Sequence, residues 1–130
     1  MNDEFVVWEP EAPGITFCLS SGRITIFLRT LALLEYPEFL RFLFNPRAGM
    51  FAVQTCSMYA EGARGMPTLK PEEGIEIKAK DLVRVVYFSR GWKDTVSYRA
   101  KGEFFPSEHL VSFNLHHAYE IHEGRIQIMT

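Results

Sequence analysis

Residues 21–56 read SGRITIFLRTLALLEYPEFLRFLFNPRAGMFAVQTC and predict a strand, a short helix and then a hairpin. Gly22 precedes a β-branched run, and leucines then recur at roughly helical spacing. Pro37 ends that run, because proline lacks an amide hydrogen and disfavours helical geometry in the residue before it. Two apolar segments flank Asn45 to Met50, whose Asn, Pro and Gly are typical of a hairpin loop. This stretch therefore indicates a segment that builds the fold, as opposed to a catalytic site.

The second half of the chain predicts the same order of elements. Residues 75–77 favour a short strand, and residues 78–90 favour an amphipathic helix. Gly91 follows at a position suited to a left-handed C-cap. Residues 96–101 and 110–115 then predict a second hairpin, with a turn between them.

These elements predict one α+β domain over residues 1–130. Two short helices are expected to pack on mostly antiparallel strands, because the helices are short and hairpins dominate. Units 14–56 and 74–116 share the order β-α-β-β, which raises the possibility of a repeat, and a connector at 57–73 joins them. We expect a core of apolar side chains from both units: Leu31, Leu34, Phe42, Phe44, Phe51, Val53, Leu82, Val85, Val86, Phe113 and Leu115.

The connector is long for an internal loop and carries several glycines and prolines. Its apolar residues need cover, whereas a free linker is more often polar. We therefore expect it to fold back across a helix or a sheet edge and to bury Tyr59 and Leu69.

Composition excludes several classes of protein. The chain has 130 residues, 47% of them apolar, a formal charge of −2 and a pI near 6.1, which argues against a uniformly basic nucleic-acid binder. Met1 to Pro13 lacks a basic leader, and no run approaches the ~20 apolar residues that span a bilayer. We expect a cytoplasmic protein with no membrane partner, in which Cys18 and Cys56 are reduced.

The common catalytic signatures are absent from the sequence. It contains neither a phosphate-binding Gly-x4-Gly-Lys-Ser/Thr loop nor a Gly-x-Gly-x2-Gly turn between a strand and a helix. His-Glu-x2-His and Gly-x-Ser-x-Gly are also missing. We therefore expect no catalytic residues, no cofactor and no enzymatic activity.

The histidines raise a metal-binding hypothesis, because neutral imidazole is a common metal ligand. On a continuing strand, adjacent His116 and His117 would point to opposite faces, so at most one of them could share a site with His122. No spacing typical of a metal site constrains them, and polar, half-exposed histidines near a strand end are the favoured interpretation. All four lie in the last quarter of the chain: His109, His116, His117 and His122.

A basic stretch runs from Lys78 to Lys101. With Trp92 and Tyr98 among its cations, it could contact phosphate and stack a base. The simpler interpretation is a solvated helix face and an outward strand face. Its basic residues are Lys78, Lys80, Arg84, Arg90, Lys93, Arg99 and Lys101, against Asp81 and Asp94.

Gly22-Arg23-Ile24-Thr25-Ile26, followed by Arg29 to Leu34, resembles AbrB-like (SpoVT/AbrB, swapped-hairpin) DNA-binding domains. Members are bacterial or archaeal regulators and antitoxins that dimerise and bind DNA through basic residues of this segment. The chain differs from the family at Phe27, where members usually have Pro, and at 35–38, where they usually have a Gly-Asp turn. The resemblance implies that Arg23 and Arg29 contact DNA, with Arg41 and Arg47 as further candidates.

The sequence thus predicts a non-enzymatic regulatory protein, with DNA as the candidate partner and a homodimer as the expected assembly. One alternative is a protein-interaction or homodimerisation module that binds no nucleic acid, and another is a small metal-binding protein that uses the histidines. The predicted DNA contacts are Arg23, Arg29, Arg41, Arg47, Lys78, Lys80 and Arg84.

Overall fold

The computed structural model describes residues 12–67 and 74–122, whose strands join in one sheet. The strands are β1 (Gly14–Cys18), β2 (Arg23–Ile26), β3 (Phe39–Asn45), β4 (Met50–Thr55), β5 (Arg64–Gly65), β6 (Ile75–Lys78), β7 (Ser97–Phe105), β8 (Leu110–Asn114) and β9 (Tyr119–Ile121). The helices are α1 (Leu28–Leu33) and α2 (Lys80–Arg90), with 3₁₀ turns η1 (Pro106–Glu108) and η2 (Leu115–His117).

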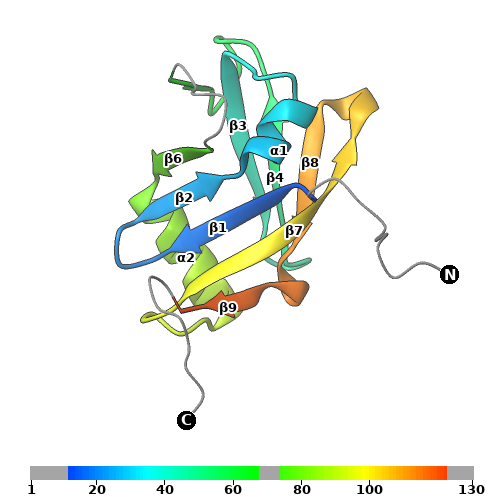
Figure 1. Cartoon of the computed structure of the whole chain (residues 1–130). Helices are drawn as coiled ribbons and strands as arrows, with labels where there is room; N and C mark the ends of the chain where they lie inside the picture. Colours follow the sequence, from blue (N-terminus) through cyan, green and yellow to red (C-terminus); the bar gives the residue numbers. More distant parts are fainter. Residues whose placement is uncertain (1–11, 68–73, 123–130) are drawn as a thin grey trace, which may run out of the picture.

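The sheet curls into a half-barrel with the strand order β5-β3-β4-β8-β7-β1-β2-β6 (Figure 1). Each of these pairings is antiparallel, and β9 pairs with β7 beside β1. The long strand β7 connects the two parts of the sheet, because its first half pairs with β1 and its second half with β8. The curl leaves a concave face for the core and an outer face for solvent.

The predicted α+β class with two packed helices is wrong. The structure is mainly an antiparallel sheet, and among the described residues only α2 is a helix of seven or more residues. Helix α1 ends at Leu33 because Glu35 and Tyr36 follow with φ of 61° and 50°, which takes the chain out of helical geometry before Pro37. This six-residue helix bridges β2 and β3.

The strands of both predicted units belong to the same sheet. The order strand, helix, strand, strand does occur in each unit, although the helices differ in length, six residues against eleven. Strand β2 pairs with β6 and β4 pairs with β8, so two of the three pairs of corresponding strands are hydrogen-bonded to each other, whereas β3 and β7 are not neighbours in the sheet. None of the helices in the described segments has the length and apolar character needed to cross a bilayer.

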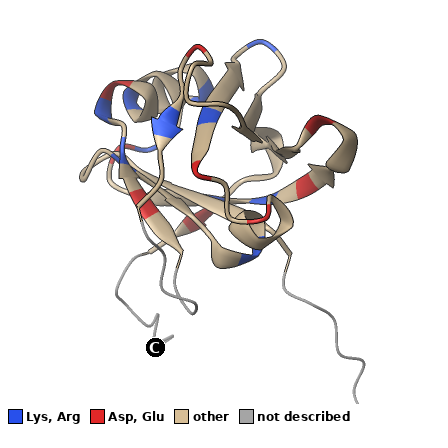
Figure 2. Ribbon diagram, turned by 90° about the horizontal axis from the view of Figure 1, so that it is seen from above, with Lys and Arg blue, Asp and Glu red and all other residues tan. Residues whose placement is uncertain are grey.

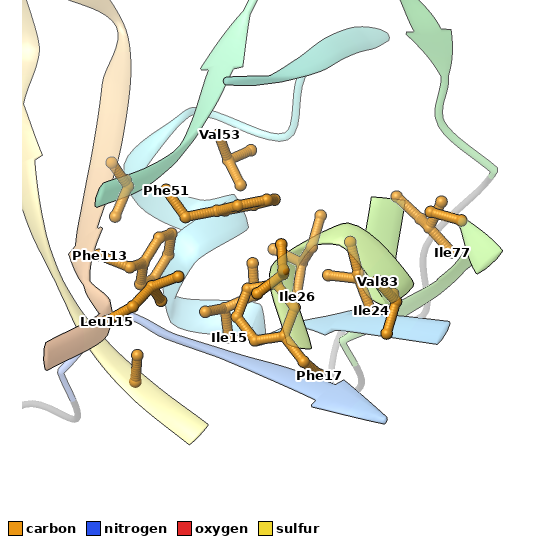
Figure 3. Close-up of a cluster of buried hydrophobic side chains, with 14 of the residues drawn as sticks. Ile15, Phe17, Ile24, Ile26, Phe51, Val53, Ile77, Val83, Phe113 and Leu115 are labelled. Carbon is orange, nitrogen blue, oxygen red and sulfur yellow. The ribbon is translucent and has the colours of Figure 1, made fainter. Parts of the chain in front are cut away.

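The core fills the concave face, where β1 and β2 face β4, β8 and α2 (Figure 3). Phe17 meets Phe51 edge to face with ring centroids 5.0 Å apart, and both rings are fully buried. Val83 reaches the same cluster from α2. Of the predicted core residues, Leu31, Leu34, Phe51, Val53, Val86, Phe113 and Leu115 are buried, and Phe42, Phe44 and Leu82 are partly buried against the core.

Of the residues predicted to form the buried face of helix α2, Val85 is placed wrongly. Val83, Val86 and Tyr87 point into the core, whereas Val85, which was expected there, is 52% exposed. The Tyr87 hydroxyl lies 3.0 Å from the carbonyl oxygen of Phe17 and 2.6 Å from that of Val96. These contacts fix the rotation of the helix about its axis.

The connector returns to the sheet through β5, which pairs with β3. The expected burial of Tyr59 is wrong, because its side chain is 88% exposed. Met66 packs against the core instead. Leu69 lies outside the described residues.

Candidate functional site

The outer face of β6, β2, β1 and β7 is polar, because the alternation of each strand sends its apolar residues inward. The strand register then places outward side chains beside one another. Arg23 of β2 is opposite Lys78 of β6, and Thr16 of β1 is opposite Arg99 of β7. Four adjacent strands therefore present cations and hydroxyl groups on one surface.

A cavity of about 310 Å³ opens on this face and is called here the outer hollow. Its wall includes side chains from five strands and from the residue before α1. The outer hollow is lined by Thr16, Cys18, Ser21, Arg23, Thr25, Phe27, Glu76, Ser97, Arg99 and Ile121.

The guanidinium group of Arg99 is held on two sides. Its Nε donates a hydrogen bond to Thr16 Oγ1 over 3.2 Å, and its Cζ lies 4.8 Å from the centre of the Phe27 ring. A Cβ atom at position 14 would lie 2.6 Å from the Phe27 ring, so Gly14 leaves the space that the ring occupies. Arg99 is thus pre-positioned by its neighbours.

The two arginines of the outer hollow differ in their charge partners. Arg23 Nη1 lies 2.9 Å from Glu76 Oε1, which neutralises its charge. Within the described ranges, Arg99 forms no ion pair. Among the Arg and Glu side chains of the outer hollow, the surplus is therefore one positive charge, located at Arg99.

Cys18 lies on the wall of the outer hollow and also lines a neighbouring cavity of about 180 Å³. Burial by itself raises the pKa of its thiol, but hydrogen bonds from Ser20, Ser21 and Ser97 outweigh burial and lower the pKa from 9.0 to about 7. A substantial fraction of the thiol is then ionised at neutral pH, and the thiolate is the nucleophilic form.

Four of the seven predicted DNA contacts meet at one corner of the molecule, called here the basic corner. Arg23 and Lys78 are paired across β2 and β6, and the backbone N–H of Ala79 donates to the carbonyl of Gly22, which brings the start of α2 to the turn before β2. Lys80 opens α2, and Arg84 follows about one turn later. The basic corner consists of Arg23, Lys78, Lys80 and Arg84.

The other three predicted contacts lie elsewhere. Arg41 of β3 donates from Nε to Gln54 Oε1 over 2.9 Å. Arg47 is exposed in the loop between β3 and β4, and Gly49 of that loop lies close to the side chain of Arg90, the last residue of α2, whereas the basic corner lies at the start of this helix. Arg29 on α1 has a buried Nε that forms no hydrogen bond within the described part of the chain. The structure does not join them in one surface.

The histidines do not form a metal site in the part of the chain that the structure describes, where no group of three or more potential ligand side chains is clustered. His116 is bonded to Arg90 and Ala48, and His122 Nε2 lies 3.5 Å from Glu120 Oε1. His109 has a φ of 51° and ends the η1 turn.

Of the residues that line the outer hollow, sequence reasoning named only Arg23 as a predicted contact. Arg99 was only one of seven cations in a basic stretch, and Phe27 and Cys18 carried no motif. The available signal was strand alternation, which places Thr16 and Cys18 on one face of β1 and Ser97 and Arg99 on one face of β7. It could not show that these faces are adjacent.

Comparison of the chain with protein-family models, with curated proteins and with solved structures gave no significant match. The resemblance of residues 21–56 to AbrB-like domains therefore stays a prediction.

Proposed function

We propose that this protein is a non-enzymatic regulatory protein that binds DNA through the basic corner. The observation that supports this proposal is the convergence of four predicted contacts from separate parts of the sequence. Pairing of β2 with β6 brings Arg23 beside Lys78, and the adjoining start of α2 adds Lys80. Clustered cations on one surface are typical of proteins that bind the phosphate groups of nucleic acids.

The charge balance of the basic corner favours an anionic partner. Arg23 pairs with Glu76, and Arg84 lies 3.9 Å from Asp81. Lys78 and Lys80 are exposed and form no ion pair with any described residue. Elsewhere in the molecule, basic and acidic residues are interspersed (Figure 2), so this local excess is consistent with a net charge of −2.

Fluorescence anisotropy with a mixed-sequence DNA duplex tests the proposal. If all four cations contact phosphate, a plot of the logarithm of the association constant against the logarithm of the salt concentration should have a slope of about −3.6. Raising the salt from about 50 to about 200 mM should then weaken binding about 150-fold. Absence of binding at the lower salt concentration would discard the proposal.

Lys80→Ala and Arg47→Ala form a matched pair for this experiment, because each removes one exposed positive charge. Lys80→Ala should weaken binding and make the salt slope shallower by about 1. Arg47→Ala should leave the slope unchanged, since Arg47 lies outside the basic corner. Equal losses in the two variants would indicate a general charge effect and contradict a defined surface.

A second candidate function is self-association, which two exposed apolar side chains on α2 favour. Phe88 is 89% exposed and Val85 is 52% exposed, one turn apart on the helix surface. Light scattering over a range of protein concentrations measures the oligomeric state. A dimer that Phe88→Ser converts to a monomer would support this function, whereas a wild-type monomer at all concentrations would exclude it.

A further inference from the structure

The outer hollow has the features of a built anion site, in addition to the basic corner beside it. Arg99 is held by Thr16 and stacks on Phe27, so its position is set before any ligand arrives. No acidic side chain among the described residues neutralises it. A guanidinium group recognises carboxylate and phosphate through paired hydrogen bonds, and only Nε of Arg99 is hydrogen-bonded to a described residue.

We propose that the outer hollow binds a small organic anion, whose carboxylate or phosphate group is held by Arg99 and whose apolar part packs against Phe27. The hydroxyl groups of Thr16 and Thr25 line the same cavity, and because Thr16 Oγ1 only accepts a hydrogen bond from Arg99, both hydroxyls can donate to the oxyanion. Ile121 extends the apolar part of the wall. The ligand class follows from this combination of one unneutralised cation, several hydroxyl donors and one aromatic ring.

The size of the cavity agrees with a small ligand. Its volume of about 310 Å³ lies at the lower end of the range for small-molecule sites, roughly 300–1,000 Å³. This inference does not rest on DNA binding, because Arg23 is the only residue shared with the basic corner and its charge is neutralised by Glu76.

Cys18 provides a direct readout of occupancy because its thiol lines the outer hollow. Alkylation by iodoacetamide should slow when a ligand fills the cavity, through steric cover and because a bound anion disfavours the reactive thiolate. Cys56 is not among the residues that line the outer hollow, so its alkylation in the same sample is an internal standard. Mass spectrometry quantifies both modifications in the intact chain.

The probes are benzoate, inorganic phosphate and a short DNA duplex, each compared with chloride at matched ionic strength. We expect millimolar benzoate or phosphate to slow alkylation of Cys18 several-fold and to leave Cys56 unaffected. If benzoate slows the alkylation of Cys18, the outer hollow is a carboxylate site. If phosphate alone slows it, the outer hollow is a phosphate site. Protection by the duplex alone would overturn the proposal, because the outer hollow would then belong to a nucleic-acid surface. Absence of protection by all three probes would overturn it as well.

Arg99→Gln tests the role assigned to the guanidinium group. It should abolish protection, whereas Arg47→Ala, which removes an equal charge elsewhere, should retain it. Unchanged protection in Arg99→Gln would contradict the proposal. If Arg99→Gln fails to fold, amide chemical shifts of the wild-type protein decide the question, because a bound probe must shift Ser97 and Thr16 more than residues of the β3–β4 loop.

Discussion

Nη2 of Arg90 lies 2.9 Å from Nδ1 of His116, and this contact sets the tautomer of the imidazole. Nε2 of the same ring lies 3.1 Å from the carbonyl oxygen of Ala48, which can only accept a hydrogen bond. Nε2 therefore carries the ring proton, and Nδ1 accepts from Arg90. The imidazole thereby connects the end of α2 to the loop between β3 and β4.

This contact makes Gly49 less replaceable than Gly91. Both have a left-handed φ, 67° and 65°, which costs a non-glycine residue roughly 1–2 kcal/mol. A Cβ atom at Gly49 would also lie 2.7 Å from His116 Nε2, whereas nothing lies within 4 Å of one at Gly91. Gly49→Ala should therefore lower the free energy of unfolding by about 1 kcal/mol more than Gly91→Ala does in urea denaturation.

The background variant His116→Ala removes the atom that Gly49→Ala would meet. In that background, the excess cost of Gly49→Ala over Gly91→Ala should largely disappear, since the other close atom, Arg90 Nη1 at 3.0 Å, belongs to the end of a flexible side chain that can move away. An excess that persists without the imidazole would show that His116 does not limit this position.

Replacement by valine should have opposite effects on the stability of the fold at Thr30 and at Thr55. Thr30 Oγ1 is buried, accepts from the Gly14 N–H and donates to the Gly14 carbonyl, both over 2.9 Å. Thr55 Oγ1 is buried and forms no hydrogen bond with residues 12–67 or 74–122. Thr30→Val should destabilise the fold by about 1–3 kcal/mol, because it leaves the Gly14 N–H unpaired, and Thr55→Val should be neutral or stabilising. Chemical denaturation measures both, and a costly Thr55→Val would contradict the assignment.

Two adjacent valines test the rotation of α2. Val86 is fully buried and Val85 is 52% exposed. Val86→Ala should cost about 2 kcal/mol through lost apolar burial and the cavity that remains. Val85→Ala should change stability by less than about 0.5 kcal/mol, because alanine is also the better helix former. An equal decrease of Tm in the two variants would show that α2 has another rotation about its axis than in this structure.

Cys18 should show a reactivity that depends on pH near neutrality. Hydrogen bonds from neighbouring serines favour the thiolate and lower the pKa of the thiol to about 7. The rate of alkylation should therefore rise with pH, reach half its maximum near pH 7 and fall to about a tenth at one pH unit below. Ser97→Ala, which removes one donor, should move the midpoint to higher pH. A midpoint near 9.0, the ordinary value, would contradict the hydrogen-bonded arrangement.

The sequence by itself determined the features that depend on a few neighbouring residues. Gly91 was expected to cap α2 and does so with a φ of 65°, because a residue without a Cβ atom adopts this geometry at little cost. The turn at Asn45 to Met50 was also predicted, and β3 and β4 form the hairpin around it. These outcomes are local, so the order of side chains is sufficient to specify them.

Only the tertiary structure decided which surfaces meet. Val85 and Val86 have the same hydropathy, so the sequence does not distinguish them. The hydrogen bond from Tyr87 to Phe17, 70 residues earlier, orients α2 so that Val86 is buried and Val85 is exposed. The same holds for the outer hollow, where Thr16 meets Arg99 only because β1 pairs with β7. Strand alternation specifies that a side chain faces outward, but its neighbours depend on pairings between distant segments, whose free energy comes from burying the whole core at once.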